Sequence, residues 1–378
     1  MLREVPQTVT LLLQRIVCGG GMMQQGSPTD EIIVEKRGNA GLIRLNRPKA
    51  INSLNQAMVS GMKAGLDAFA RDPDITCVIL SGEGERGLCA GGDVREIHAA
   101  KAASETDRTR FWREEFPLNY TISHYPKPYI ALMDGIVMGG GVGVSAHGRY
   151  RIVTERTRLA MPETAIGYFP DVGASWLLSK APGEVGTWLG LTGREIGAAD
   201  AIYAGLADDH VAADRLGDLV HVLADVSFAA DVGAVIEGFS SKPAVDGFLA
   251  SHQKEIDAAF GFDTMEDIIE ALASTESDFA RETLATLQLR SPTSLKLTLQ
   301  LLRLGRMSSG LVECLEREFA AGCEVLRNPD FYEGVRAALI DKDRNPKWRP
   351  DTLAQVSDED IDRYFVSANP PLFADHRL

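Results

Sequence analysis

The stretch YIALMDGIVMGGGVGVSA, residues 129–146, decides the fold class of this 378-residue chain. It opens with an apolar run at 129–133 that is typical of a buried strand, and a glycine-rich segment at 139–143 then begins a helix of small residues. Strands that alternate with helices indicate an α/β protein. Functional sites in such folds gather where strand ends meet helix starts, so this junction is also a candidate site.

The same alternation continues upstream. Residues 32–35 and 41–45 are two β-type runs whose glycine-rich connection predicts a hairpin, and 75–80 is another buried-strand run. Between the runs at 41–45 and 75–80, apolar residues three or four positions apart predict an amphipathic helix with Asn52 or Ser53 as its N-cap. These apolar residues are Leu54, Met58, Met62, Leu66 and Phe69.

After a further strand expected at 150–153, helical patterns dominate the chain. The clearest lie at 188–191, 198–203, 265–272 and 294–304. We therefore predict an α/β fold in three segments. Residues 1–29 are a poorly ordered or non-core segment, residues 30–215 form the α/β core, and residues 216–378 form a helical C-terminal region.

Composition narrows the class of function. The chain has 39 Lys and Arg against 53 Asp and Glu, and its net charge of −14 argues against general binding to nucleic acid or an anionic membrane. No stretch approaches the ~18 apolar residues of a membrane span. The five cysteines have no metal-ligand spacing, so we expect a reducing compartment and no metal. An anionic ligand would need a local basic pocket or backbone N–H groups.

The first 26 residues differ from the rest of the chain. They hold a short apolar run at 9–13 without a following small-residue cleavage site, which disfavours a secretory signal. Arg3 and Arg15 allow a transit peptide, although the segment contains no serine. We favour a tail or a true start at Met22 or Met23, and a cytoplasmic protein, with the mitochondrial matrix as the alternative.

Two glycine-rich turns are candidate binding sites. In CAGGD at 89–93, adjacent glycines at a helix start let a ligand approach the backbone, whereas the plain alternative is a tight turn with Asp93 as a helix-terminal charge. MGGGVG at 138–143 matches the dinucleotide-binding fingerprint poorly. It offers either close helix packing or an exposed N–H that stabilises an oxyanion.

Three acidic residues are candidates for catalysis. Glu163 and Asp171 lie in an apolar segment rich in proline and glycine, where burial would raise their pKa values and suit them to acid or base roles. The alternative is that they cap helices or turns. Of the neighbours Glu114 and Glu115, at most one faces a pocket lined by Trp112 or Phe116, because adjacent helical residues point about 100° apart. The alternative is that both lie on a solvated helix face.

Together these segments resemble the enoyl-CoA hydratase/isomerase (crotonase) superfamily, and within it the 3-hydroxyisobutyryl-CoA hydrolase branch. The resemblance covers roughly residues 30–355. It implies a spiral of ββα units with a helical C-terminal region, an acyl-CoA substrate, and no cofactor other than the CoA that enters with the substrate. Its motifs are LNRPKAINSL (45–54), CAGGD (89–93), KP (127–128), MGGGVG (138–143), MPET (161–164), FPDVG (169–173), SPTSLK (291–296), EGVRA (333–337), IDKD (340–343) and PKW (346–348).

The resemblance also implies roles for individual residues. The N–H groups of Gly92 and Gly140 would form an oxyanion hole for the thioester carbonyl. Glu163 would attack this carbonyl or direct water onto it, and Asp171 would orient the acyl hydroxyl or the water and help the thiolate leave. Further substrate-binding positions are Glu115, Gly91, Asp93, Lys49, Ala50 and Asn52.

The residue type at position 143 distinguishes the hydratases of the superfamily from its hydrolases. Hydratases hold water between two glutamates, of which one matches Glu163 and the other would fall at Gly143. We therefore expect hydrolysis of 3-hydroxyisobutyryl-CoA, and of 3-hydroxypropionyl-CoA, as in valine catabolism. The alternatives are a hydratase or isomerase that acts on another acyl-CoA, and a non-catalytic acyl-CoA-binding protein. The resemblance allows a homo-oligomer, because trimers are common in the superfamily.

Overall fold

The computed structural model describes residues 23–24, 30–368 and 370–373. At its centre is a seven-stranded sheet of order β1-β2-β3-β4-β5-β7-β9, antiparallel from β1 to β3 and parallel from β3 onwards. The strands are β1 (Met23–Gln24), β2 (Ile32–Arg37), β3 (Ala40–Leu45), β4 (Cys77–Gly82), β5 (Tyr129–Met133), β7 (Tyr150–Val153) and β9 (Asp209–His210). The predicted N-terminal segment lies outside the described residues except at β1.

The predicted hairpin and the helix after it are confirmed, but the N-cap of the helix is not. β2 pairs with β3, and the apolar stripe from Met58 to Phe69 lies on α2 (Gln56–Arg71). Leu54, the first residue of the predicted stripe, precedes the helix and forms a β-bridge with Gly92. The N-cap is Asn55, whose Oδ1 accepts a hydrogen bond from the N–H of Met58 at 3.0 Å. The prediction of Asn52 or Ser53 is wrong because Ile51 and Asn52 adopt left-handed conformations, with φ of 50° and 53°, and belong to a loop.

A small second sheet was not predicted. β6 (Ile136–Met138) pairs in parallel with β8 (Arg158–Ala160). Single bridges join Gly87 to Gly135 and Cys89 to Val137, so the turn after β4 is held against the segment that follows β5. This pairing brings the two glycine-rich turns of the sequence together.

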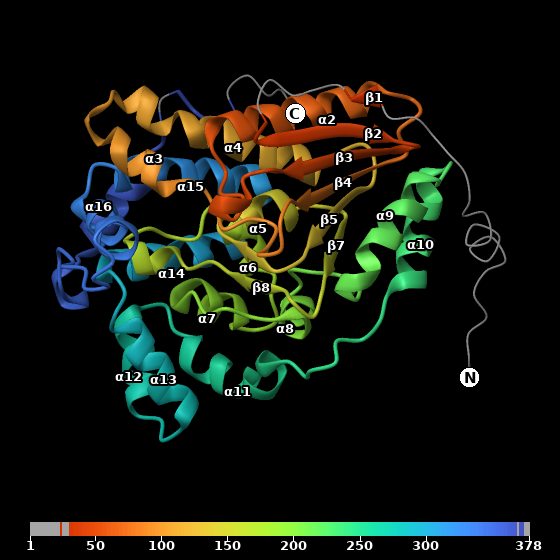
Figure 1. Cartoon of the computed structure of the whole chain (residues 1–378). Helices are drawn as coiled ribbons and strands as arrows, with labels where there is room; N and C mark the ends of the chain where they lie inside the picture. The colour runs from red at the N-terminus through yellow and green to blue at the C-terminus, as the bar shows by residue number, and fades with distance from the viewer. Residues whose placement is uncertain (1–22, 25–29, 369, 374–378) are drawn as a thin grey trace.

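Helices cover both faces of the central sheet (Figure 1). On one face α9 (Leu216–Ala224) and α10 (Val232–Phe239) pack against Leu42, Ile79 and Ile130 in a separate apolar cluster. The other face carries the larger core, which includes α2 and α4 (Glu105–Ser123). The predicted strands at 75–80, 129–133 and 150–153 are β4, β5 and β7, and the predicted helix after the triple glycine is α5 (Gly140–Ser145).

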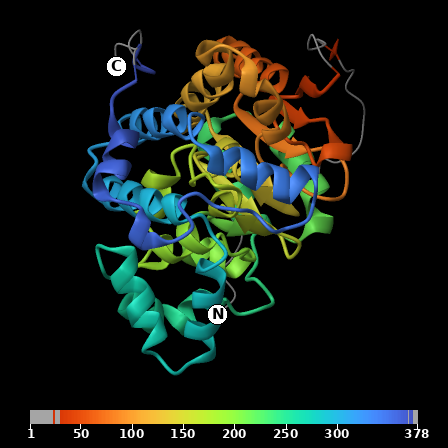
Figure 2. The same ribbon diagram turned by 90° about the vertical axis from the view of Figure 1, so that its left-hand side faces the viewer.

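The C-terminal helices pack against the α/β core as well as against each other (Figure 2). α14 contacts α6 and α7, and α15 contacts α4. The remaining helices are α3 (Val94–Ala99), α6 (Ala174–Leu178), α7 (Val185–Thr192), α8 (Ala198–Tyr203), α11 (Phe248–Phe260), α12 (Met265–Ala273), α13 (Asp278–Leu287), α14 (Pro292–Met307), α15 (Leu311–Val325), α16 (Pro329–Val335) and α17 (Asp358–Asp362). Short 3-10 or π turns are η1 (Pro48–Ala50), η2 (Ala100–Ala102), η3 (Glu163–Ile166), η4 (Ala213–Arg215), η5 (Ala229–Asp231), η6 (Arg336–Ile340), η7 (Leu353–Gln355) and η8 (Arg363–Phe365). Among these described helices, none is both long and apolar enough to cross a membrane.

Candidate active site

A cavity of about 250 Å³ lies where the two glycine-rich turns meet. Its walls combine backbone from both turns with three carboxyl groups and a set of aromatic rings. The principal lining residues are Gly91, Gly92, Phe111, Trp112, Glu115, Gly139, Gly140, Glu163, Tyr168, Asp171 and Phe331. We call this space the glycine-lined cavity.

The first turn is held by strand-like pairing with the loop before α2. The N–H of Leu54 donates to the carbonyl of Gly91, and the N–H of Asp93 donates to the carbonyl of Leu54, both at 2.8 Å. Gly91 has a φ of 106°, which a side chain would disfavour. Among the described residues no acceptor is found for the N–H of Gly92, so this group is available to a ligand.

At the second turn, the carboxyl groups of Glu163 and Glu115 lie close to the backbone of Gly139 and Gly140. A Cβ at Gly139 would lie 2.8 Å from Oε1 of Glu163, and a Cβ at Gly140 would lie 2.7 Å from Oε1 of Glu115 and 3.2 Å from the nitrogen of Gly92. Glycine is therefore required at both positions for Glu163 and Glu115 to approach. The N–H of Gly140 also has no acceptor within the described part of the chain. Two free N–H groups thus face one cavity beside two carboxyl groups.

The three carboxyl groups of the cavity are all buried. Glu163 is 8% exposed at the start of η3, Asp171 is 6% exposed and Glu115 is 1% exposed on α4. Glu163 Oε2 and Glu115 Oε1 have no hydrogen-bond partner among the residues that the structure describes. Such groups favour the neutral form because burial penalises the charged one. The Glu114 neighbour points outward and accepts a hydrogen bond from Ser60, so the prediction that at most one of the pair faces a pocket is confirmed.

Burial and mutual repulsion raise the pKa of each carboxyl group. Burial, followed by the charge of Asp171, raises the pKa of Glu163 well above its ordinary value. Burial, followed by the charges of Asp171 and Glu163, does the same for the pKa of Glu115. Burial and then Glu318 raise the pKa of Asp171 to about 8. The predicted rise for Glu163 and Asp171 is therefore confirmed, and the cluster can hold both an acid and a base near neutral pH.

Gly143 is closed off by the turn that carries Asp171. A Cβ at Gly143 would lie 2.6 Å from Cβ of Val172 and 3.0 Å from Nδ2 of Asn119. No side chain fits there without a shift of the packing. The space beside Gly143 is filled by Val172, so a second glutamate cannot be accommodated at this position.

The remaining predicted substrate-binding side chains lie outside the lining of the cavity. Asp93 forms an ion pair with Arg47 at 3.0 Å and provides no side-chain cap to α3. Lys49 is exposed on η1. Asn52 is fully buried, where its Oδ1 accepts from the N–H of Arg47 and its Nδ2 donates to the carbonyls of Glu83 and Gly87. Asp93 and Asn52 hold the loop that follows β3, in which Ala50 also lies.

Sequence patterns missed several residues that shape the site. Tyr168 stacks on Trp112 with ring centroids 5.6 Å apart and planes at 8°, which forms an apolar wall of the cavity. Glu318 on α15 is fully buried beside the turn after Asp171 and binds its backbone. Glu318 is 147 positions away from Asp171, so no local pattern could indicate the contact.

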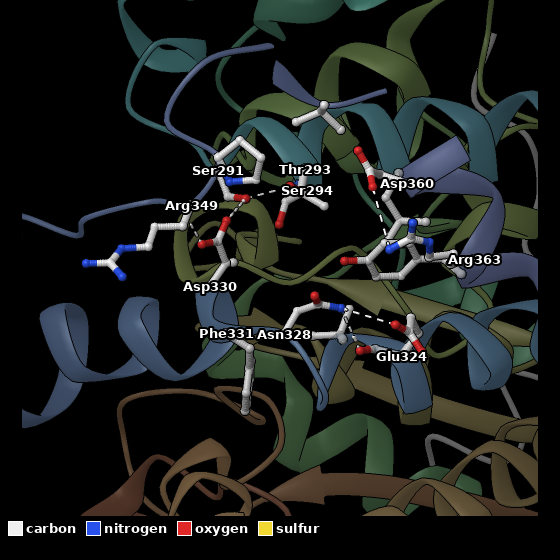
Figure 3. Close-up of a pocket in the computed structure, with 16 residues that line it drawn as sticks. Ser291, Thr293, Ser294, Glu324, Asn328, Asp330, Phe331, Arg349, Asp360 and Arg363 are labelled. Atoms are coloured by element: carbon white, nitrogen blue, oxygen red, sulfur yellow. Dashed lines mark hydrogen bonds and ion pairs between the residues drawn. The ribbon is translucent and has the colours of Figure 1, made fainter. Parts of the chain in front are cut away.

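Phe331 lines both the glycine-lined cavity and a second cavity of about 140 Å³, which is drawn in Figure 3. The motif at 291–296 contributes to the lining of this second cavity, and the hydroxyl of Ser291 is bound within the protein. The hydroxyl of Ser291 donates to Asp330 at 2.6 Å, and the N–H of Arg349 donates to the same carboxyl at 2.8 Å. The guanidinium group of Arg349 points away from the space (Figure 3). This motif therefore joins α14 to α16.

Curated relatives match this chain over most of its length. The 3-hydroxyisobutyryl-CoA hydrolase, mitochondrial, of Rattus norvegicus is 41% identical over 351 residues and 91% of each chain. The protein with the same description from Danio rerio is 42% identical over 94% of each chain. The one from Homo sapiens is 40% identical over 92% of this chain and 91% of its own.

Solved structures share the fold. A carnitinyl-CoA dehydratase from Mycobacterium thermoresistibile superposes with a TM-score of 0.86 at 43% identity, covering 91% of this chain and 98% of its own. An enoyl-CoA hydratase from Rhodobacter sphaeroides gives 0.84 at 39% identity, with 91% and 99% covered. The predicted crotonase-like fold is thereby confirmed. The sequence model of the enoyl-CoA hydratase/isomerase family matches residues 40–365, and the chain belongs to this family.

Proposed function

We propose that this enzyme hydrolyses the thioester of 3-hydroxyisobutyryl-CoA to the free acid and CoA. The observation that carries the proposal is the placement of Glu163, Asp171 and Glu115 around two free N–H groups in one cavity, while Gly143 has no room for a hydratase glutamate. The curated relatives described as 3-hydroxyisobutyryl-CoA hydrolases support the same substrate.

In the proposed mechanism the thioester oxygen accepts hydrogen bonds from the N–H groups of Gly92 and Gly140. One such donor contributes about 3–4 kcal/mol to the stability of the oxyanion. Glu163 acts after it has lost its proton, and its raised pKa makes the carboxylate a stronger base. It then takes a proton from a water molecule that attacks the carbonyl carbon, or attacks this carbon itself to give a mixed anhydride that water opens. Either route breaks the C–S bond.

The other two carboxyl groups complete the reaction. Asp171 in its protonated form donates a hydrogen bond to the acyl hydroxyl or a proton to the departing thiolate, in keeping with its raised pKa of about 8. Glu115 contacts the substrate beside Gly140. These groups supply acid, base and oxyanion stabilisation, so the proposed reaction needs no cofactor beyond the CoA of the substrate. Among the described residues no group of three or more His, Cys, Asp or Glu is arranged to hold a metal.

Hydration or isomerisation of an enoyl-CoA is the second candidate. Two solved structures favour it, since one is described as a dehydratase and the other as a hydratase, at 43% and 39% identity. An isomerase needs one base, which Glu163 would supply. The third candidate, a non-catalytic acyl-CoA-binding protein, would keep binding without turnover.

The test measures thiol release from 3-hydroxyisobutyryl-CoA and hydration of crotonyl-CoA in parallel. Wild type should release thiol with negligible hydration, and Glu163→Gln should lose thiol release by about 10²–10⁴-fold. Glu114→Gln, one position from Glu115 but outside the cavity, is the matched control and should keep full activity. Hydration without thiol release would support the second candidate, and acyl-CoA binding without turnover would support the third.

Two finer points belong to the same proposal. The enzyme should also accept 3-hydroxypropionyl-CoA, because one methyl group changes discrimination by only about 1–3 kcal/mol. The vertebrate relatives are described as mitochondrial, whereas we expected a cytoplasmic protein. Fusion of residues 1–29 to a fluorescent reporter tests whether this segment directs import into mitochondria.

A further inference from the structure

The turn that carries Asp171 has an unfavourable backbone. Val172 has a φ of 54°, in the left-handed region that β-branched residues rarely adopt, and Gly173 follows at 83°. A strained conformation persists only where surrounding contacts over-determine it. The contacts around this turn therefore determine where the Asp171 carboxyl points.

Glu318 of α15 binds the backbone of the turn at 172–175. Its Oε2 accepts the N–H of Gly173 at 2.7 Å, and its Oε1 accepts both the N–H of Ser175 at 2.9 Å and the hydroxyl of Ser175. Glu318 has no solvent exposure. Both of its oxygens therefore face hydrogen-bond donors, which is the arrangement that a carboxylate requires.

Two further contacts hold the same turn from other sides. Nε2 of His147 lies 2.7 Å from the carbonyl of Val172. Burial lowers the pKa of His147 to about 4, so the ring is neutral at pH 7 and its Nε2–H donates to this carbonyl. Val172 also packs on Gly143. Glu318 is the member of this set that brings a charge.

We infer that Glu318 is a positioning residue for the proposed hydrolysis: it fixes the turn at 172–175 and places a buried negative charge near Asp171, so that Asp171 works in its protonated form. The inference rests on the proposed function, because it gives Asp171 the role of acid or hydrogen-bond donor. It adds a residue of the C-terminal helices to the machinery of the cavity.

The electrostatics of the cavity support this role. The ionisable groups that face Asp171 are Glu115 from α4, Glu163 from η3, Tyr168 from its own segment and Glu318 from α15. After burial, Glu318 is the largest cause that raises the pKa of Asp171 to about 8. Burial raises the pKa of Glu318 only to about 7, since its hydrogen bonds oppose the rise. Glu318 thus loses its proton at lower pH than Asp171, and its negative charge then disfavours the ionisation of Asp171.

The experiment compares the pH dependence of kcat/KM for thiol release in wild type and Glu318→Gln. Activity should fall on the alkaline side as Asp171 loses its proton. Removal of a neighbouring negative charge lowers a carboxyl pKa, so this alkaline limb should move to lower pH by about one unit in Glu318→Gln. Glu313→Gln is the control. Glu313 lies on the same helix and pairs with Arg317, and its substitution should leave the alkaline limb of the pH profile in place. In an Asp171→Asn background, Glu318→Gln should cause no further shift.

An unchanged alkaline limb in folded Glu318→Gln would overturn the inference. If Glu318→Gln does not fold, ¹³C NMR of the carboxyl groups of wild type provides the second measurement, with the Asp171 signal assigned by Asp171→Asn. Asp171 should titrate above pH 7, and at higher pH than Glu318. Titration of Asp171 below pH 6, or at lower pH than Glu318, would contradict the inference. A wild type that releases no thiol would instead refute the proposed function.

Discussion

At the scale of single residues, the missing side chain at Gly143 shapes the chemistry as much as the carboxyl groups that are present. The turn at 171–173 both presents Asp171 and fills the space beside Gly143 with Val172. A glutamate at 143 and this turn are therefore mutually exclusive.

Gly143→Glu should destabilise the protein without creating a hydratase. The new side chain would overlap Val172, and such overpacking costs about 1–3 kcal/mol. Urea unfolding should show this loss, and hydration of crotonyl-CoA should stay negligible. Gly217→Glu is the control, because a Cβ there meets no atom within 4 Å. A stable Gly143→Glu variant that hydrates crotonyl-CoA would contradict the packing argument.

The raised pKa of Asp171 predicts a cost in stability that depends on pH. The folded protein holds this proton up to about pH 8, whereas the unfolded chain releases it near pH 4. Stability therefore falls as pH rises between these values, because the folded state binds more protons. Asp171→Asn removes the effect and should stabilise the protein by about 1–3 kcal/mol at pH 8, but little at pH 4.

Urea unfolding of wild type and Asp171→Asn at pH 4 and pH 8 measures this difference. The exposed Asp246→Asn is the matched control and should change stability equally at both values. A gain for Asp171→Asn that is the same at pH 4 and pH 8 would show that the Asp171 carboxyl is not held neutral in the folded state.

At the scale of elements, the loop between β3 and α2 connects the hairpin to the first glycine-rich turn. Asn52 joins it to the carbonyls of Glu83 and Gly87, and Arg47 joins it to Asp93. Leu54 then pairs with the backbone on both sides of Gly92. The position of the Gly92 N–H thus depends on contacts within this loop.

Asn52→Ala should weaken both stability and catalysis. It leaves buried carbonyls without donors, which costs about 1–3 kcal/mol, and it removes an asparagine from a left-handed position that asparagine tolerates well. The melting temperature should fall and kcat for thiol release should fall with it. Asn46→Ala, whose amide donates to Asp30 at the surface, is the control and should have little effect. Full activity in Asn52→Ala would show that the loop does not position Gly92.

Elements whose signal lies within their own sequence were predictable. The spacing of Met58, Met62 and Leu66 was enough for α2. β6 and β8 were missed because each has only three residues and forms through pairing with distant backbone. The sequence motifs predicted Glu163 and Asp171 as site residues, and both line one cavity in the structure. The role of Glu318 depends on a tertiary contact that no local pattern contains.

At the scale of the whole molecule, the C-terminal helices complete the core that surrounds the cavity. Phe319 of α15 packs edge-on against Phe116 of α4, with ring centroids 6.4 Å apart. Phe331 of α16 forms a wall of the cavity. Residues from α4, α14 and α15 share one apolar cluster, whereas α9 and α10 form their own cluster on the far face of the sheet.

We therefore expect one cooperative unfolding transition in which activity, near-UV circular dichroism and calorimetry change together. The shared cluster and the Glu318 contact make the α/β core and helices α14–α16 unstable without each other. Phe319→Ala should lower the single midpoint, with a cost of about 3–5 kcal/mol, without splitting it. Val235→Ala, on α10 in the separate cluster, is the comparison. Two transitions, with activity lost at the lower one, would show instead that the C-terminal helices fold as an independent unit docked onto the core.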